Sequence, residues 1–255
     1  MNRQAGKTLR GDRRRSREVA AVLMARLPGR FSTELGLRLE GRRRLDLFLW
    51  LLAAILFGTR ISGSIAVRTH AEFVRRGLTS PERMLQTGWD GLVEVLDAGG
   101  YVRYDYKTAT KLLEVAKNLL DRYDGDLNKL HAAARNAEDL NVRLKGLGKG
   151  IGDVTVEIFQ RELWEVWPKA QPPLSSLALL AVNHLKLGMS AATGRAVNAI
   201  GPLRQVWNEA GPSGYGFADF ESALVRLGRD YCRKQRWDAC PMRDFGCGLR
   251  RRRTG

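Results

Sequence analysis

Apolar residues recur at helical spacing through most of residues 45–235, and few stretches show the alternation of apolar and polar positions that is typical of strands. Residues 45–57 are apolar almost all round, which predicts a buried helix that ends at Gly58. Ser80, Pro81 and Glu82 form a helix-start signal. The expected fold class is therefore all-α, with short connections. The pattern predicts further helices at about 105–123, 153–164, 174–187, 193–208 and 217–235.

Positive charge is concentrated at the two ends of the 255-residue chain, whose net charge is +16. Residues 1–44 contain 13 lysines and arginines against 4 acidic residues, and residues 229–255 contain 9 against 3, whereas the region between them is nearly neutral. Blocks of like charge repel one another and favour a polyanionic partner. We therefore expect nucleic acid as the partner; an anionic membrane surface, or a solvated tail without a partner, is the alternative.

The composition argues against a secreted or membrane protein. Three cysteines are too few for a disulfide framework, which favours a reducing compartment. The longest uncharged apolar run, residues 47–57, has 11 residues, whereas a membrane-spanning helix needs roughly 20. The first 17 residues are polar and basic, unlike a secretory signal. We expect a cytoplasmic protein, nucleoid-associated if the source is prokaryotic, with no membrane partner, and the sequence indicates no protein partner.

A glycine-rich stretch at residues 144–156 predicts a tight hairpin between two helices. Gly150 and Gly152 can adopt positive φ and let the backbone approach a phosphate, while Ile151 between them can anchor the hairpin to the core. The N–H groups of residues 152–155 would form a helix N-terminus, which is a natural phosphate site. Lys149 adds positive charge there, whereas Asp153 is unfavourable for a phosphate but suits the start of a helix.

The segment Gly150-Ile151-Gly152-Asp153-Val154-Thr155-Val156 resembles the helix-hairpin-helix of the endonuclease III-like DNA glycosylase superfamily. The resemblance extends over roughly residues 45–247, in the same order and at nearly the same spacings. Residues 51–59 resemble the buried helix that leads to the base-intercalating loop of that superfamily. Further similar segments are Gly100-Tyr101, residues 107–109, residues 125–127 and residues 228–232.

This resemblance implies two helical domains that flank a DNA-binding cleft, bend the duplex and extrude a damaged base. Duplex DNA, possibly damaged, is the implied partner, and Thr59 and Arg60 would lie in the loop that fills the gap left by the base. Phosphate contacts would come from Lys149, Gly150, Ile151, Gly152 and Thr155. The implied domains are a basic arm at 1–16, a bundle at 41–166 with the hairpin, a second domain of 17–40 plus 167–247, and a basic tail at 248–255.

The chain departs from the superfamily at both expected catalytic positions. Val154 stands where bifunctional members have a nucleophilic Lys, so the resemblance implies no Lys-dependent lyase activity. Members that only hydrolyse the glycosidic bond need a carboxylate after the hairpin helix, but residues 168–177 contain no Asp or Glu. Ser175 or Ser176 occupies the matching place, and Asp105 is a candidate replacement whose alternative role is a helix cap. The catalytic residues are therefore unknown.

The cysteines near the C-terminus depart from the superfamily in the same way. Cys232, Cys240 and Cys247 resemble its iron–sulfur segment, but a [4Fe–4S] cluster normally needs four thiolates. Either the cluster is lost and the thiols serve packing, or Asp238, Asp244 or a non-protein ligand completes it. No cofactor is certain, and an iron–sulfur cluster is the candidate.

These features together predict a DNA-binding protein of the base-excision-repair type. Its activity would be that of a monofunctional DNA N-glycosylase without the usual catalytic Lys and Asp. The alternative is a non-enzymatic binder of damaged or distorted duplex DNA. An RNA-binding module is a third interpretation, because basic ends do not distinguish the two polymers.

Overall fold

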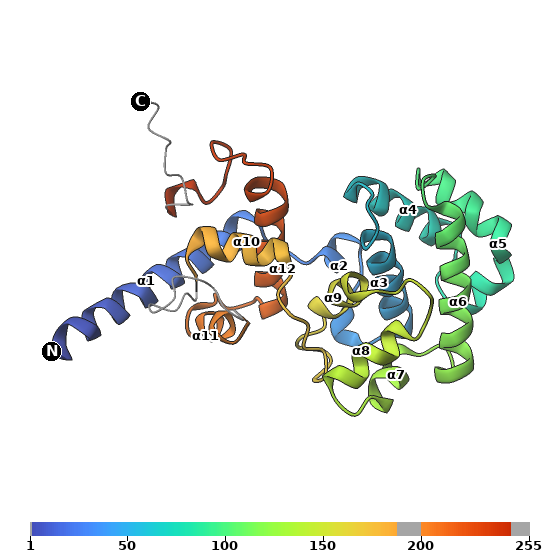
Figure 1. Ribbon diagram of the computed structural model, residues 1–255, viewed down its shortest axis with the longest axis horizontal. Coiled ribbons are helices and arrows are strands. Elements are labelled where there is room, and N and C mark those ends of the chain that lie inside the picture. Colours follow the sequence, from blue (N-terminus) through green and yellow to red (C-terminus); the bar gives the residue numbers. More distant parts are fainter. Residues whose placement is uncertain (1, 188–199, 246–255) are drawn as a thin grey trace. The chain divides into compact units, whose positions relative to one another are not determined.

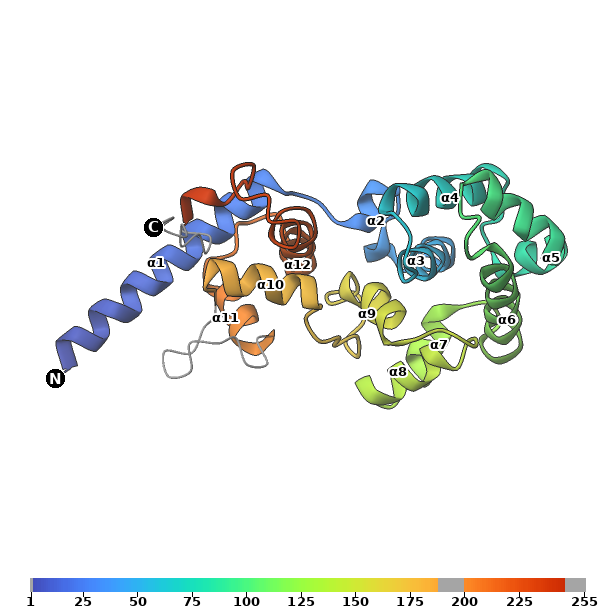
Figure 2. The same ribbon diagram turned by 45° about the horizontal axis from the view of Figure 1, so that its top comes forward.

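A computed structural model of the chain describes residues 2–187 and 200–245, with side chains described from residue 14 onward (Figures 1 and 2). The chain is all-α: the described residues contain helices and no strand. None of the described helices is both long enough and apolar enough to span a membrane. The chain divides into two compact units, residues 31–172 and residues 1–30 with 173–255.

The unit of residues 31–172 is built around α3 (Arg44–Phe57), in which every side chain from Asp46 to Leu56 is buried. The Trp50 indole N–H donates to the Phe159 carbonyl at 2.8 Å, which joins α3 to α9. The helices α5 and α6 run side by side along one edge of this unit (Figure 1). Its other helices are α2 (Phe31–Glu34), a short 3-10 helix (Leu39–Gly41), α4 (Gly63–Arg75), α5 (Pro81–Ala98), α6 (Asp105–Tyr123), α7 (Leu127–Ala133), α8 (Ala137–Lys145) and α9 (Asp153–Arg161).

The other unit packs α12 (Phe217–Leu227) against α1 (Asn2–Arg26) and α10 (Ser176–Leu185). Every residue of α12 except Asp219 is buried, and Asp219 forms an ion pair with Arg30 at 3.0 Å. A Cβ on Gly228 would lie 2.0 Å from the Leu177 carbonyl oxygen, so α10 crosses the chain there at backbone contact. The remaining elements are α11 (Ile200–Ala210), a π-turn (Gly228–Cys232) and a short helix (Arg243–Phe245).

The hydrophobic pattern located several helices closely. The helix predicted at 105–123 has those bounds, and the one predicted at 45–57 begins one residue earlier. The Ser80 hydroxyl accepts the Arg83 N–H and caps α5 as expected. Three helices are shorter than predicted: α9 ends at Arg161, α10 covers 176–185, and α12 gives way to a π-turn after Leu227. The helix predicted at 193–208 is α11, and residues 193–199 lie outside the described part.

The boundaries of the two units differ from the domains that the resemblance implied. Residues 31–40 and 167–172 group with α3–α9. The backbone N–H groups of Phe31 and Ser32 donate to the buried Glu162 carboxylate at 2.8 and 2.9 Å, and this contact ties residues 31–40 to the end of α9. At the N-terminus, residues 2–26 form one continuous helix, which contains most of the expected basic arm. The Arg15 guanidinium donates to the Leu185 and Phe245 carbonyls at 3.0 and 2.9 Å.

Candidate nucleic-acid interface

The glycine-rich stretch forms a tight connection between α8 and α9. Gly150 has a φ of +84°, and the Ile151 N–H donates back to the Gly148 carbonyl at 3.1 Å. The Ile151 side chain is 6% exposed and so anchors the turn to the core. Gly152 differs from the prediction, because its φ of −101° is negative. One left-handed residue is enough to reverse the chain here, and Gly152 takes the extended conformation that an N-cap requires.

The side chains of α6 hold the backbone of this connection, which we call the 146–152 loop. The Asn118 amide donates to the Leu147 carbonyl and the Arg122 guanidinium to the Gly146 carbonyl, both at 2.9 Å. The Glu114 carboxylate accepts the Lys149 N–H at 2.8 Å. The three side chains are spaced four residues apart and therefore share one face of α6. The loop is thus fixed by side-chain bonds to its backbone as well as by Ile151.

Two glycines allow the loop to lie directly on α6. A Cβ on Gly148 would lie 2.9 Å from the Val115 side chain, and one on Gly150 would lie 3.1 Å from Cε of Lys111. By contrast, a Cβ on Gly152 would meet nothing within 4 Å, because this residue faces open space. The loop is therefore closely packed at its first half and accessible at the point where α9 begins.

The first turn of α9 presents backbone N–H groups without helical partners. The first intrahelical backbone bond runs from the Val156 N–H to the Gly152 carbonyl at 3.1 Å, which leaves the N–H groups of Val154 and Thr155 without a backbone acceptor in the helix. Gly152 has no side chain to cap them. The Asp153 N–H donates to the carboxylate of its own side chain. Gly152, Asp153 and Val154 are exposed, and so is Lys149. An anion could approach these N–H groups from solvent.

The Asp153 carboxylate, expected to oppose a phosphate, is bound by a cation. Lys145 at the end of α8 forms an ion pair with it. The hydrogen bond and the charge of Lys145 hold the pKa of Asp153 below its usual value. The carboxylate is therefore ionised at neutral pH, and the neighbouring ammonium offsets its charge.

The structure also brings the loop after α3 to the start of α9. Gly58 caps α3, and a Cβ on it would lie 2.5 Å from Oγ1 of the buried Thr155. Thr59 and Arg60 follow directly, and Arg60 is exposed. The Ser62 hydroxyl then accepts the Ile65 N–H at 3.3 Å and starts α4. Two segments chosen separately from the sequence, 59–60 and 149–155, are thus neighbours. Thr155 is buried, however, so its side chain packs rather than facing solvent.

Two of the three candidate catalytic residues, Ser175 and Asp105, have local structural roles. The Ser175 hydroxyl accepts the Ala178 N–H at 3.2 Å and caps α10, while Ser176 is exposed in the first turn of that helix. Asp105 is the first residue of α6, and its carboxylate accepts the Tyr106 N–H at 2.7 Å. Asp105 belongs to the unit of residues 31–172, whereas both serines belong to the other unit. Val154, in the first turn of α9, is 57% exposed.

Asp105 faces a second carboxylate. Partial desolvation raises the pKa of the exposed Asp97, and the charge of Asp105 together with a hydrogen bond between the two side chains raises it further. Asp97 lies at the end of α5, where a negative charge also opposes the helix dipole. The pair is an electrostatic cost to the fold at neutral pH.

The cysteine segment is only partly described. Cys232 and Cys240 are both buried, at 3% exposure, and Cys247 lies outside the described residues. Among the residues with described side chains, no group of three His, Cys, Asp or Glu is placed to hold a metal ion. The sequence contains three cysteines, one fewer than the four thiolates that normally hold a [4Fe–4S] cluster.

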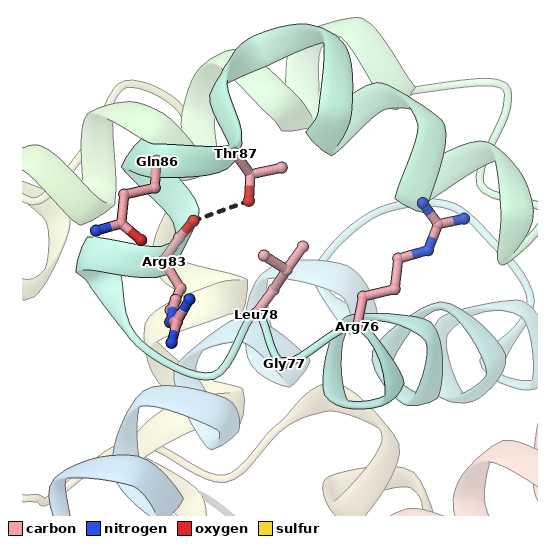
Figure 3. Close-up of a pocket in the computed structure, with 6 residues that line it drawn as sticks. All are labelled: Arg76, Gly77, Leu78, Arg83, Gln86 and Thr87. Atoms are coloured by element: carbon pink, nitrogen blue, oxygen red, sulfur yellow. Dashed lines mark hydrogen bonds between the residues drawn. The ribbon is translucent and has the colours of Figure 1, made fainter.

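A shallow pocket of about 440 Å³ lies between the end of α4 and the start of α5 (Figure 3). Its lining contains one apolar side chain, Leu78, and no aromatic ring. The guanidinium groups of Arg76 and Arg83 point in different directions, and Thr87 donates to the Arg83 carbonyl at 2.9 Å (Figure 3). An extruded base needs stacking partners, so this pocket does not suit one. Its lining residues are Arg76, Gly77, Leu78, Arg83, Gln86 and Thr87.

The sequence alone did not indicate the residues of α6 that hold the loop. Lys111, Glu114, Asn118 and Arg122 lie on a polar face of an amphipathic helix, and such a face is ordinarily solvated. The four-residue spacing of Glu114, Asn118 and Arg122 indicates that they share one face of the helix, but nothing in the sequence shows which segment that face contacts. Comparison with known proteins found no family, no curated protein and no solved structure that matches the chain.

Proposed function

We propose that the protein binds duplex DNA by its phosphate backbone, with the 146–152 loop and the first turn of α9 as the primary contact. The observation that carries this proposal is a solvent-exposed helix N-terminus, at which Gly152 provides no side-chain cap, following a turn fixed by side chains of α6. Backbone N–H groups held in this way can bind a phosphate at little entropic cost. Contacts of this kind position a protein on DNA without selecting a base sequence.

Under this proposal α8, the loop and α9 act as a helix-hairpin-helix, as in the endonuclease III-like superfamily. Arg60 supports the assignment, because it is exposed in a segment that adjoins Thr155 through Gly58. Lys149 is likewise exposed next to the glycines. The two units would correspond to the two helical domains of that superfamily, and the basic ends would add electrostatic attraction to any duplex.

The capping role of Ser175 favours non-enzymatic binding over base excision. Its hydroxyl is already engaged with the Ala178 N–H, and it cannot stabilise positive charge on a sugar as a carboxylate would. Val154 offers no nucleophile. A protein that binds damaged or distorted duplex DNA therefore fits these residues better than a monofunctional N-glycosylase does.

The first experiment measures binding to one duplex with and without a central abasic-site analogue, at matched salt near physiological strength. Three proteins are compared: the unchanged chain, Gly152→Gln and Gly201→Gln. Gly201 is a suitable control because a Cβ there also meets nothing within 4 Å, yet it lies on α11 in the other unit. We expect Gly152→Gln to weaken binding about tenfold, which is roughly 1.4 kcal/mol, while Gly201→Gln binds as the unchanged chain does.

Three further outcomes decide between the functions. Equal affinity of all three proteins for the duplex would remove the loop from the interface. Tighter binding to single-stranded RNA than to the duplex at equal salt would support the RNA-binding alternative. Release of a base from a panel of damaged duplexes in single-turnover reactions would establish a glycosylase and overturn the non-enzymatic assignment.

A further inference from the structure

Lys111 on α6 brings a positive charge beneath the turn of the 146–152 loop. A Cβ on Gly150 would lie 3.1 Å from Cε of Lys111 and 3.4 Å from its Nζ, so the ammonium group lies beside the Gly150 backbone. A side chain at residue 150 would make this contact tighter. The positive φ of Gly150 creates the turn, and the absent side chain leaves room for the cation.

This ammonium differs from its neighbours in its electrostatic surroundings. Lys117, six residues further along α6, forms an ion pair with Asp121, and Lys145 forms one with Asp153. No carboxylate of the described residues forms an ion pair with Lys111, and burial alone lowers the pKa of its ammonium. Glu114, one turn away, directs its carboxylate to the Lys149 N–H instead. A half-buried cation beside the exposed backbone of Gly150, two residues before the N-cap of α9, is a favourable place for an anion.

We propose that Lys111 is a phosphate ligand of the loop, contributing a charge-assisted hydrogen bond to the phosphodiester that the N–H groups at the start of α9 bind. The inference rests on the proposed DNA-binding function and adds to it a residue outside the glycine motif. It also gives Gly150 a second role beyond its positive φ, since a Cβ there would crowd the end of the Lys111 side chain. The loop would thus present neutral donors from its backbone and one full charge from α6.

The test compares the salt dependence of duplex binding for the unchanged chain, Lys111→Gln, Lys111→Arg and Lys117→Gln. Lys117→Gln is the matched control, because it removes the same charge from an exposed side chain of the same helix. We expect Lys111→Gln to weaken binding three- to tenfold and to reduce the slope of log K against log salt by about 0.9. Lys111→Arg should keep the slope of the unchanged chain, as should Lys117→Gln.

The outcomes separate this inference from the function on which it rests. If Gly152→Gln weakens binding but Lys111→Gln leaves affinity and slope unchanged, Lys111 is not a ligand while the loop remains the interface. If Lys111→Gln and Lys111→Arg weaken binding equally, the lysine only packs against the loop and stabilises its conformation, and the proposal is wrong. If Gly152→Gln has no effect either, the loop does not bind DNA and both proposals fail.

Discussion

Gly58 at the end of α3 and Thr155 in the first turn of α9 are in contact, with no space for another carbon between them. A Cβ built on Gly58 would lie 2.5 Å from Oγ1 of Thr155 and 3.0 Å from the carbonyl oxygen of Ala54. Thr155 is buried and cannot turn into solvent. This contact fixes the position of the segment that begins with Thr59 relative to the start of α9, and it joins two parts of the candidate interface that are about a hundred residues apart in the sequence.

Gly58→Ala should therefore destabilise the protein by overpacking. We expect a loss of about 1–3 kcal/mol in the free energy of unfolding, because one contact is with backbone and the other is with a buried side chain. Urea unfolding at pH 7 measures this loss. Gly63→Ala is the control, since a Cβ at Gly63 meets nothing within 4 Å, and its effect should stay within about 0.5 kcal/mol.

The same contact predicts a coupling between the two positions. Thr155→Ala removes the hydroxyl that the new methyl group would strike, so Gly58→Ala should cost less in the Thr155→Ala background than in the unchanged chain. A double-mutant cycle should give an interaction energy of about 0.5–2 kcal/mol in the favourable direction. Additive losses would mean that α3 and α9 move apart to accommodate the methyl group.

Local pattern located several of the helices but not the contacts between them. The stripe that includes Leu112, Ala116 and Leu119 located α6 correctly, since all three are buried. The left-handed turn at Gly150 and the anchoring role of Ile151 also followed from residue type. The sequence did not show that Gly152 keeps a negative φ, because a glycine permits both signs and its neighbours decide between them.

Contacts between distant segments are the part that could not be predicted. The hydrogen bond from Asn118 to the Leu147 carbonyl spans 29 residues, and the bond from Ser32 to Glu162 spans 130. Both depend on how the helices pack, which a single sequence does not state. The break inside α5 is a related case, because Gly88 adopts φ 71° within an otherwise helical pattern. Glycine there permits the break, but packing determines it.

The carboxylate pair of Asp97 and Asp105 predicts that acid stabilises this part of the fold. The pKa of Asp97 is raised in the folded protein, so the folded state binds its proton more tightly than the unfolded state does. The resulting stabilisation is fully present below the unfolded pKa and is lost as the pH rises through the folded pKa. Asp97→Asn removes the repulsion and should raise stability at pH 7 by less than about 1 kcal/mol, because both groups contact solvent.

Urea midpoints at pH 7 and pH 3 check this prediction. The gain from Asp97→Asn should be present at pH 7 and should vanish at pH 3, where Asp97 of the unchanged chain is itself protonated. Asp90→Asn is a matched control on the same helix, with an exposed carboxylate. A gain that persists at pH 3 would point to helix propensity rather than to the carboxylate pair.

His131 predicts the opposite response to acid. Its ring stacks on Trp167 with centroids 4.7 Å apart, and burial, with the charges of Lys169 and Arg42, lowers its pKa to about 4. The unfolded chain takes up this proton near pH 6.5, so stability is present above that pH and is lost as the pH falls toward 4. The ring is partly exposed, which reduces the expected loss between pH 7 and pH 5 to about 1 kcal/mol.

His131→Phe should abolish that loss while keeping the ring stack. The measurement is the difference in unfolding free energy between pH 7 and pH 5 for the two proteins. A second histidine, His70, is the other candidate source of this pH dependence. It is buried on α4, its Nε2 lies 3.2 Å from the Leu49 carbonyl, and burial lowers its pKa. If His131→Phe retains the full pH dependence of the unchanged chain, then other groups, His70 first among them, account for it.

Removing the basic ends should reduce the salt dependence of DNA binding, and it should leave the contribution of the 146–152 loop to affinity unchanged. Removing residues 1–13 and 249–255 takes away eight basic side chains and one acidic side chain. The cut is placed before Arg15, because that side chain bonds the Leu185 and Phe245 carbonyls and its removal would disturb the fold. The slope of log K against log salt should fall by about 0.9 for each phosphate that the shortened protein no longer neutralises.

Gly152→Gln should weaken DNA binding by the truncated protein as much as binding by the full chain, since the loop and the ends contact separate phosphates. A slope that truncation leaves unaltered would show that the ends are solvated and bind no phosphate.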